Sequence, residues 1–456
     1  MLVQALTRDR RLRFGTLRID GPVLSGSSTM PTPLKPPTWQ HWAKYYSGLL
    51  GFKVESVLEP IKISTLCSGS DAPVAALGEI VGEAKLRHEY SLDAASYPEK
   101  FVMVNFEPAH YFHADISAIN DPSAAHCSVC RDQCRAHTKP ADFEVAGFPC
   151  TPFSTLRGDR WAPEYDPWQQ ASSRPFLEIA HRLHSSSNLP RAMVLENVDG
   201  VERDTRSCGK PLHFIMHGVV MWKGEEKKVG LAFLEPRFHI LPLVRMRASA
   251  FGLPFVRKRV FWILLRRDSF STDDVQKILD NLAKIQAHPL EKSPIDSFIT
   301  DEEEEGIMPI KKRKTLQVMK MTTNSVITSG RVRHAQGLPG VQHPDGQPFQ
   351  VELLGNPRLH LTSYLLSPRE KDCVGVAYLL TKKQHGDVPD DLIVDTSQPV
   401  DRCPWTFNGK APALHTNSRL VYRGKLLSAD TLSACLAGHE RSSCPSLPAP
   451  VPPVVC

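Results

Sequence analysis

The sequence predicts an α/β protein built around an open, mostly parallel β-sheet. Between residues 61 and 267, short apolar runs typical of buried strands alternate with amphipathic segments typical of helices. Several of these runs end in reactive or charged side chains, and open α/β sheets bind ligands beyond the carboxyl ends of their strands. The alternation fades after Arg267, which predicts a second, smaller and loop-rich domain.

The individual elements follow from this pattern. Aromatic residues at helical spacing between residues 39 and 52 predict a short helix at the edge of the domain. Strands are expected at residues 61–67, 89–94, 141–148, 192–198 and 259–267, and helices at residues 73–81, 99–106 and 175–185.

Composition divides the 456 residues further. The expected regions are a disordered leader and linker at 1–38, the α/β domain at 39–267, the second domain at 268–410 with a disordered charged insertion near 295–316, a segment at 411–440 that returns to the first domain, and a proline-rich tail at 441–456.

Overall composition indicates a soluble protein inside a cell. Hydrophobic residues make up 41% and charged residues 23% of the chain, and no apolar run reaches the roughly 18 residues that span a bilayer. The eleven cysteines show no paired framework, so we interpret them as reduced thiols or metal ligands. The net charge of +6 allows a polyanionic partner without requiring one.

Cys150 stands between two prolines, directly after an expected strand, in the stretch VAGFPCTPFS. A stiff turn of this kind holds a thiol at a fixed angle, which suits a nucleophile and also an inert structural cysteine. Glu196 and Asn197, and then Arg257 and Arg259, occur at the ends of two further apolar strands. Because buried charges are costly unless they meet partners in a cleft, these side chains are expected to converge.

A second set of residues occurs at the ends of the first strands. The turn STLCSGSDAP after the first strand would bring backbone N–H groups close to a ligand, or would be only a structural turn. Asp93 follows about 24 residues after Gly69, where a carboxylate could bind ribose hydroxyls, and Asp115 occupies the same kind of position one strand later. A solvated surface carboxylate is the alternative for each aspartate.

These blocks, in this order, resemble the cytosine-5 methyltransferases that use S-adenosylmethionine. The resemblance covers roughly residues 61–267 and 411–439. The matching stretches are STLCSGSDAP, HEYSLDAASYPEKFVMVNF, HADI, GFPCTPFS, RPFLEIAHRL, LENV, GLPFVRKRVF and PALHTNSR with GKLLSADTLSACLAGH. The resemblance implies the Rossmann-like open mixed sheet of class I methyltransferases, with residues 39–267 as the catalytic domain and 268–410 as a target-recognition domain.

The resemblance also implies roles for individual residues. Cys150 would add to carbon 6 of cytosine, Glu196 would hold and protonate ring nitrogen 3, and Arg259, with Arg257 beside it, would steady the carbonyl and the Glu196 carboxylate. The cofactor S-adenosylmethionine would lie against Cys67, Ser68, Gly69, Asp93, Ala94, Asp115, Ile116 and Pro149. A base inside a duplex is out of reach, so the target would be flipped out or unpaired.

Three features depart from the family pattern. The first motif lacks its aromatic residue and its second glycine, Phe255 stands in place of a glutamine, and the last family motif is not recognisable after His439. These departures predict weakened cofactor binding and low but measurable activity.

The stretch HCSVCRDQCRAH offers a candidate zinc site. Its spacing predicts Cys127, Cys130, Cys134 and His137 as tetrahedral ligands, and a solvent loop with incidental thiols is the alternative.

The expected partner is nucleic acid, with DNA favoured over transfer RNA, and no membrane. The stretch PIKKRKT could be a nuclear import signal, a phosphate-contacting patch or a solvated charge run. We expect a nuclear protein; five arginines in the first twenty residues leave a plastid or mitochondrial address as the alternative. Other functions left open are a transfer-RNA methyltransferase, for which CPWTFNG is a loose match, and a non-catalytic nucleic-acid-binding relative.

Overall fold

The protein divides into two compact units. The computed structural model describes residues 42–292, 323–338 and 366–427, apart from positions 122, 124, 156–159, 161, 163, 206–208, 223–224, 256, 409–410, 413–417 and 423–424. The described part of the first unit comprises residues 42–250 and 258–290, and that of the second comprises residues 251–257 and those from 291 onward. The expected leader, the charged insertion and the C-terminal tail lie outside the described residues.

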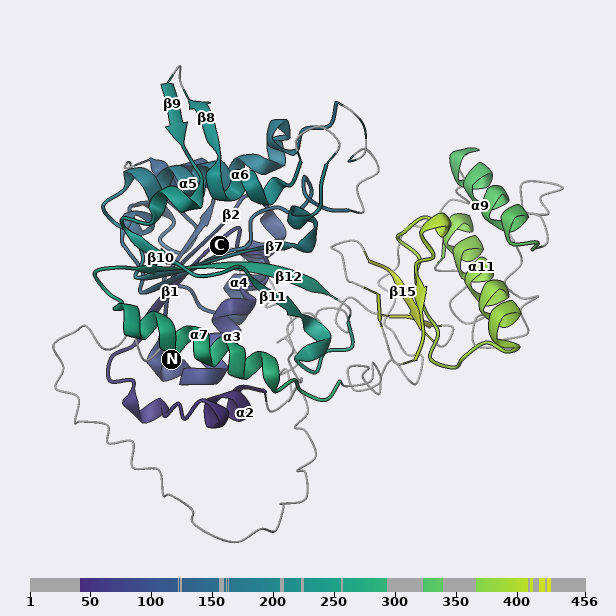
Figure 1. Cartoon of the computed structure of the whole chain (residues 1–456), viewed down its shortest axis with the longest axis horizontal. Helices are drawn as coiled ribbons and strands as arrows, with labels where there is room; N and C mark the ends of the chain where they lie inside the picture. Colours follow the sequence, from purple (N-terminus) through teal and green to yellow (C-terminus); the bar gives the residue numbers. More distant parts are fainter. Residues whose placement is uncertain are drawn as a thin grey trace, which may run out of the picture. The chain divides into compact units, whose positions relative to one another are not determined.

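The first unit is built on a mixed sheet with the strand order β10-β12-β7-β6-β1-β2-β3, and β11 also pairs with β12 (Figure 1). Its strands are β1 (Ile61–Leu66), β2 (Leu86–Asp93), β3 (His110–His113), β6 (Phe143–Ala146), β7 (Ala192–Val198), β10 (Phe238–Ile240), β11 (Val244–Arg247) and β12 (Lys258–Arg266). Strands β7, β6, β1, β2 and β3, which are neighbours in this order, are parallel. Strand β12 runs antiparallel to both β7 and β10. The predicted α/β class with an open mixed sheet is confirmed.

Helices cover both faces of this sheet (Figure 1). One face carries α5 (Arg174–Ser185) and α6 (Pro211–His217), and the other carries α3 (Ala72–Val81) and α7 (Thr272–Ala287). Successive side chains of β12 point to opposite faces of the sheet. Trp262 therefore packs into the hydrophobic core under α5, and Ile263 packs into the core under α3. The other α-helices and strands among the described residues of this unit are α2 (Trp42–Leu49), α4 (Ser96–Asn105), and the hairpins of β4 (Ala125–Cys127) with β5 (Asp132–Cys134) and of β8 (Val219–Trp222) with β9 (Glu225–Lys228).

Local signals explain where the helices begin and end. Helix α3 has a proline in its first turn and ends at Gly82, whose φ of 81° suits glycine. Helix α7 begins with a capping box between Ser271 and Asp274 and lays Ile278 on the sheet. Because α7 packs there, the first unit extends to Leu290, beyond the boundary at residue 267 that the sequence suggests.

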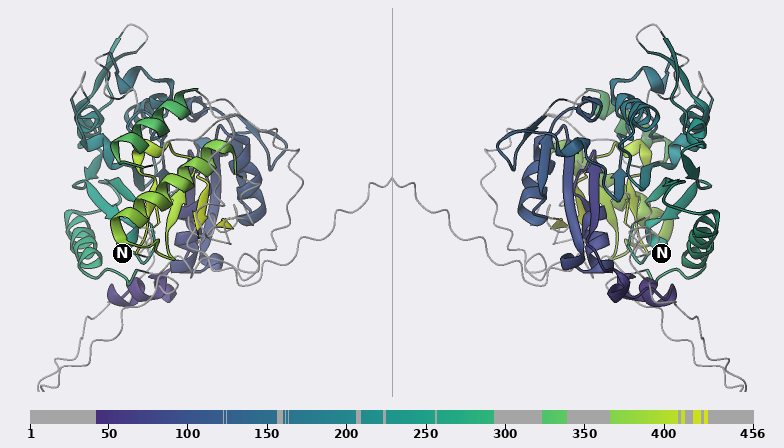
Figure 2. Two further views of the ribbon diagram at one scale, coloured as in Figure 1. Left: turned by 90° about the vertical axis from the view of Figure 1, so that its right-hand side faces the viewer. Right: turned by 90° about the vertical axis from the view of Figure 1, so that its left-hand side faces the viewer.

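In its described residues, the second unit combines two α-helices with a small antiparallel sheet (Figure 2). Its helices are α9 (Thr323–Ala335) and α11 (Pro368–His385), and its sheet has the order β14 (Trp405–Thr406), β13 (Ile393–Asp395), β15 (Leu420–Tyr422) and β16 (Lys425–Leu426). Helix α11 is covered by the sheet on one side and by α9 on another, so it lacks the single apolar stripe that reveals a helix in a sequence. Residues 411–427 group with this unit, whereas the sequence places segment 411–440 with the first domain.

None of the described helices combines the length and apolar composition that would be needed to cross a bilayer.

A buried polar triad ties the parallel strands to α5. Glu144 on β6 is fully buried, accepts a hydrogen bond of 2.8 Å from the Tyr90 hydroxyl and pairs with the Arg182 guanidinium at 2.6 Å. Burial raises the pKa of the Tyr90 hydroxyl, and the Glu144 charge raises it further. Burial alone would lower the pKa of Arg182, but Glu144 holds it above its usual value, so we take the carboxylate and the guanidinium as an ion pair.

Replacing Arg182 by leucine should destabilise the first unit by about 3–5 kcal/mol, because it leaves the Glu144 carboxylate buried without its cation. Urea unfolding followed by tryptophan fluorescence would measure this loss. Arg245→Ala is the matched control, since the Arg245–Glu202 pair is solvent-exposed and should contribute less than about 1 kcal/mol. Equal losses in the two variants would contradict the role given to the triad.

Candidate functional site

The sheet order places a switch point between β1 and β6. From β1 the chain moves outward through β2 and β3, and it then returns to add β6 on the other side of β1. At such a point the two loops leaving the strands diverge and open a crevice beyond their carboxyl ends, which is where open α/β sheets bind ligands. The loop after β1 begins at Cys67, and the loop after β6 contains Cys150.

The loop after β1 is fastened to the end of β2 by Asp93. One oxygen of this carboxylate accepts the Gly69 N–H at 3.0 Å, and the other accepts the Ala95 N–H at 2.9 Å. Gly69 has a φ of 54°, and a methyl group placed on it would have no heavy atom within 4 Å. The loop therefore presents open space in front of Gly69, with a carboxylate at its edge that keeps lone pairs for a hydroxyl ligand.

A buried network beneath this loop explains how it keeps its shape without the second glycine. Asp71 takes the left-handed conformation, with a φ of 51°, which aspartate tolerates better than most residues. Its carboxylate accepts hydrogen bonds from the hydroxyls of Thr65 at 2.5 Å and Ser91 at 2.6 Å. His88 Nε2 lies 2.7 Å from the Ser91 hydroxyl and 3.6 Å from Asp71.

The electrostatics of this network follow from burial. Burial raises the pKa of Asp71 to about 7, although the hydrogen bonds from Ser91 and Thr65 lower it in part. Burial also lowers the pKa of His88 to about 4. Both groups are therefore neutral in mildly acidic solution.

The other residues assigned to the cofactor have distinct surroundings. Burial raises the pKa of the Cys67 thiol to about 12, and the nearby charges of Asp93 and Asp115 contribute to the rise. This sulfur therefore stays protonated. Asp115 caps a short turn by accepting the Ser117 N–H at 2.9 Å, and hydrogen bonds from Ser117 lower its pKa. The Ile116 side chain belongs to the hydrophobic core, which leaves only its backbone for a ligand.

The Ala94 carbonyl oxygen lies 3.0 Å from Nε2 of His113. Ser68 donates its backbone N–H to the Leu92 carbonyl at 3.2 Å, which fixes the loop to the neighbouring strand. Pro149 is half-buried beside Cys150.

Glu196 lies beside the start of the Cys150 loop because β6 and β7 are in register. Ala146 pairs with Leu195, so the next residues along, Gly147 and Glu196, are neighbours. A methyl group placed on Gly147 would lie 3.4 Å from Oε2 of Glu196. Asn197 donates a hydrogen bond of 3.0 Å to the Phe148 carbonyl, which ties the two segments together one residue further on.

Two residues that the motifs did not indicate, Arg160 and Gly200, hold the Cys150 loop in place. Arg160 is fully buried and donates to the carbonyls of Phe153 at 2.5 Å, Gly200 at 2.8 Å and Arg203 at 2.7 Å. A methyl group on Gly200 would lie 2.1 Å from the Phe153 oxygen, so only glycine fits there. A buried arginine gives no periodic signal, but the glycine next to the Glu-Asn-Val block could have been suspected.

The two arginines of the GLPFVRKRVF stretch belong to different units of the protein. Arg259 on β12 forms an ion pair with Glu196 across the neighbouring strand. Arg257 belongs to the second unit, together with Phe255, which is buried against Ile393 and Tyr422. The aromatic residue found in place of the family's glutamine is thus a core residue of the second unit.

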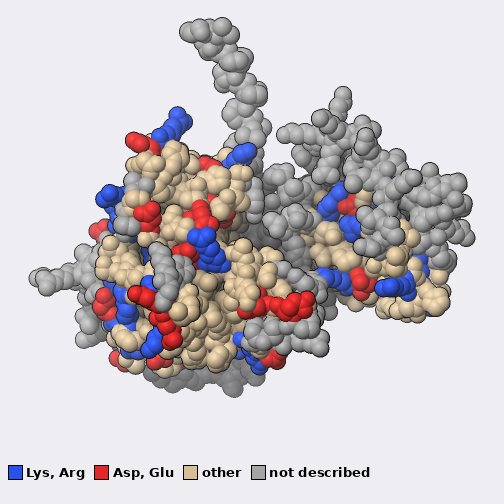
Figure 3. All heavy atoms as spheres, turned by 90° about the horizontal axis from the view of Figure 1, so that it is seen from above, with Lys and Arg blue, Asp and Glu red and all other residues tan. Residues whose placement is uncertain are grey.

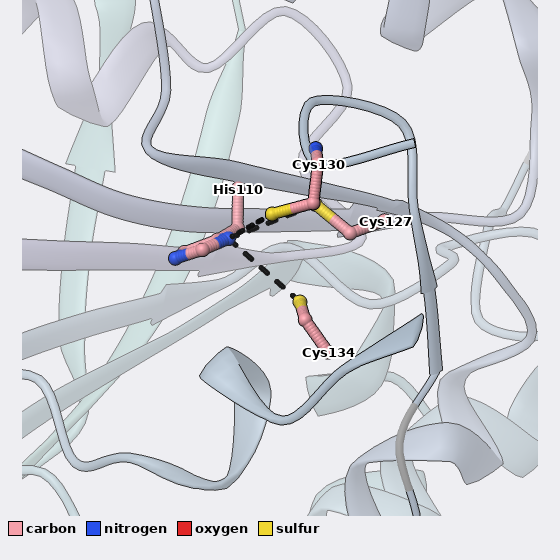
Figure 4. A group of neighbouring side chains, drawn as sticks. All are labelled: His110, Cys127, Cys130 and Cys134. Carbon is pink, nitrogen blue, oxygen red and sulfur yellow. Dashed lines mark hydrogen bonds between the residues drawn. The ribbon is translucent and has the colours of Figure 1, made fainter. Parts of the chain in front are cut away.

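The structure corrects the expected metal ligands. Cys127, Cys130 and Cys134 do converge, but their partner is His110 at the start of β3 (Figure 4). His137 lies in the core instead, where its ring meets Phe112 edge to face at a centroid distance of 5.0 Å and its Nε2 lies 3.2 Å from the Asp121 carbonyl oxygen. His110 lies 17 residues before Cys127, too far along the chain for spacing to reveal it.

Charged side chains are interspersed on the described surface shown in Figure 3, where basic and acidic groups alternate. The net charge of +6 therefore does not by itself mark a nucleic-acid-binding face in this view.

The strand order, with antiparallel β12 between β7 and β10, and the two loops at the switch point define a class I methyltransferase fold. Residues 120–336 match the model of the family described as C-5 cytosine-specific DNA methylase. This match supports the family that the motifs predicted.

A curated relative supports the same family over a shorter stretch. It is named DNA (cytosine-5-)-methyltransferase DMT5, from Verticillium dahliae, and is 28% identical over 107 residues. This match covers 22% of the chain and 4% of the length of the relative.

Solved structures of methyltransferases are similar only at a low level. The Dnmt2 methyltransferase of S. pombe has 15% identity and a TM-score of 0.32, with 61% of this chain and 66% of that chain covered. The methyltransferase EhMeth of Entamoeba histolytica has 12% identity and a TM-score of 0.33, with 53% and 61% covered. At these TM-scores the similarities carry no argument.

Replacing Asp71 by asparagine should change how stability depends on pH. The folded-state pKa of about 7 lies above the ordinary carboxyl value of 3.8, so the folded protein keeps a proton that the unfolded chain releases. The contribution of Asp71 to the free energy of unfolding is therefore complete below about pH 4 and is lost as the pH rises to about 7.

Asparagine has no such proton, so the stability of Asp71→Asn relative to the native protein should improve steadily across this range. Urea unfolding of both proteins at several pH values would measure it. A stability difference that does not change with pH would show that Asp71 is ionised throughout.

Proposed function

We propose that the protein transfers a methyl group from S-adenosylmethionine to carbon 5 of cytosine in DNA, through a covalent adduct of Cys150. The observation that carries the proposal is the Glu196–Arg259 ion pair beside the loop that presents Cys150. The match to the family model supports the cytosine-5 chemistry, and the family description and the name of the curated relative favour DNA.

The residues at the ends of β1, β2 and β3 fit the cofactor. S-adenosylmethionine carries a positively charged sulfonium, two ribose hydroxyls and an electrophilic methyl group, which it supplies to the reaction when bound. Asp93 and Asp115 provide two carboxylates near the Cys67 loop, and Gly69 leaves room for close approach. Two acidic acceptors beside an open glycine turn suit a cationic ligand that bears hydroxyls.

On the other side of the switch point, the chain's own residues would activate the base. Cytosine carbon 5 is a poor nucleophile, so the Cys150 thiolate adds to carbon 6 and forms a carbon–sulfur bond. Glu196 donates a proton to ring nitrogen 3, which offsets the negative charge that the addition creates. Arg259 orients the Glu196 carboxylate. After carbon 5 is alkylated, it gives up its proton to a base and the carbon–sulfur bond breaks, which returns the thiolate. Ring nitrogen 3 gives its proton back to Glu196, so the base leaves neutral and the acid is restored.

The target cytosine would have to leave a duplex to reach Cys150, because the reacting carbons of a stacked base are covered by their neighbours. Transfer RNA with an unpaired cytosine is the second substrate to test. If DNA is the substrate in a eukaryotic cell, we propose that the protein acts in the nucleus. The basic stretch PIKKRKT, a candidate import signal, lies outside the described residues.

Cys150→Ser should abolish methyl transfer, because a serine hydroxyl is a much weaker nucleophile than a thiolate. The measurement is transfer of labelled methyl groups from S-adenosylmethionine to duplex DNA, single-stranded DNA and transfer RNA. Cys444→Ser is the matched control, since Cys444 belongs to none of the stretches assigned to the site and should leave the rate unchanged.

The substrate panel separates the candidate functions. Incorporation into DNA supports the proposal, and incorporation into transfer RNA alone overturns the DNA assignment. If the native protein labels neither substrate, it is a non-catalytic relative. An unchanged rate in Cys150→Ser would exclude the covalent mechanism.

Glu196→Gln should lower kcat by about 100-fold to 10,000-fold, because glutamine keeps the shape but cannot donate the proton. The same assay would measure it under saturating substrate. Glu202→Gln changes a nearby glutamate whose carboxylate pairs with exposed Arg245, and it should have little effect on kcat. A similar loss in both variants would point to a general disturbance of this segment.

A further inference from the structure

Four side chains from the β3, β4 and β5 region converge on one point (Figure 4). His110 begins β3, Cys127 ends β4, Cys130 lies in the turn, and Cys134 ends β5. Nδ1 of His110 lies 3.7 Å from Sγ of Cys127, 3.3 Å from Sγ of Cys130 and 3.7 Å from Sγ of Cys134. All four candidate ligand atoms lie within 4.8 Å of one another.

These distances match a tetrahedral metal site. With zinc–sulfur bonds of about 2.3 Å and zinc–nitrogen bonds of about 2.05 Å, tetrahedral angles place nitrogen and sulfur about 3.6 Å apart. The same geometry places two sulfurs about 3.8 Å apart. We propose that His110, Cys127, Cys130 and Cys134 bind one structural zinc ion.

The backbone of the hairpin supports a metal-binding turn. The N–H of Cys130 points at Sγ of Cys127 at 3.4 Å, a contact that stabilises a thiolate, and Arg131 closes the turn with a φ of 56°. Strands β4 and β5 have three residues each. Hairpins this short are marginal in water by themselves, so a metal ion bound by the three sulfurs would stabilise this one.

Zinc would fasten this hairpin to the edge of the main sheet. Strand β3 is the last strand of the sheet, and Ser128 of the hairpin donates its N–H to the Tyr111 carbonyl at 2.8 Å. His110 supplies a ligand from β3 itself, while the three cysteines come from the hairpin. The ion would therefore join the two segments, as structural zinc commonly does in small closed sites.

The test is metal analysis of the full-length protein purified without chelators and under reducing conditions. We expect about one zinc per chain in the native protein and near zero in His110→Ala and Cys130→Ser. His126→Ala is the matched control, because His126 is an exposed histidine of the same hairpin. This variant should retain about one zinc per chain. Removal of zinc from the native protein should also lower the Tm by at least about 5 °C.

Cobalt(II) exchanged into the native protein gives a readout that does not depend on any variant folding. We expect the intense visible absorption of a tetrahedral site together with sulfur-to-cobalt charge-transfer bands. Native protein that contains no zinc and takes up none, or that contains iron instead, would overturn the proposal. Full zinc occupancy in His110→Ala would overturn the assignment of the fourth ligand.

Discussion

The fixed register of β6, β7 and β12 is the constraint on which the candidate site depends. Backbone hydrogen bonds set Ala146 beside Leu195 and Val198 beside Arg259. This register places Glu196 between Gly147 and the Arg259 guanidinium. The positions of the three residues are thus fixed by the backbone of the sheet. Because this arrangement exists without a ligand, little reorganisation would be needed for the proposed reaction.

The strands and the motif positions could be predicted from the sequence because both depend on local patterns. Apolar runs of strand length place β1, β6, β7 and β12. The residues after the parallel strands β1, β6 and β7 and those at the start of antiparallel β12 then lie at one edge of the sheet. Contacts between distant segments leave no such pattern. The role of Arg160 becomes visible only in the folded structure, where it donates to three carbonyl groups. The same holds for His110, which lies beside three cysteine sulfurs. The antiparallel direction of β12 likewise depends on chain connections rather than on residue type.

Departures from the family pattern have physical explanations in the structure. Asp71 takes the backbone conformation that a glycine would supply, and hydroxyl partners on β1 and β2 hold it there. Phe255 contributes to the core of the second unit instead of offering a polar contact. The segment 251–257 belongs to that core, while Arg259, two residues further along, pairs with Glu196 in the first unit. A motif that is continuous in sequence thus serves two separate units.

The hydrogen bond from Ser128 to the Tyr111 carbonyl has a consequence for how the protein behaves in solution. An uncovered outer strand offers a row of unpaired backbone groups to which strands of other chains can add. The β4–β5 hairpin already occupies part of the outer side of β3. Protection from strand-to-strand aggregation at this margin is thus built into the same insertion that carries the three cysteines.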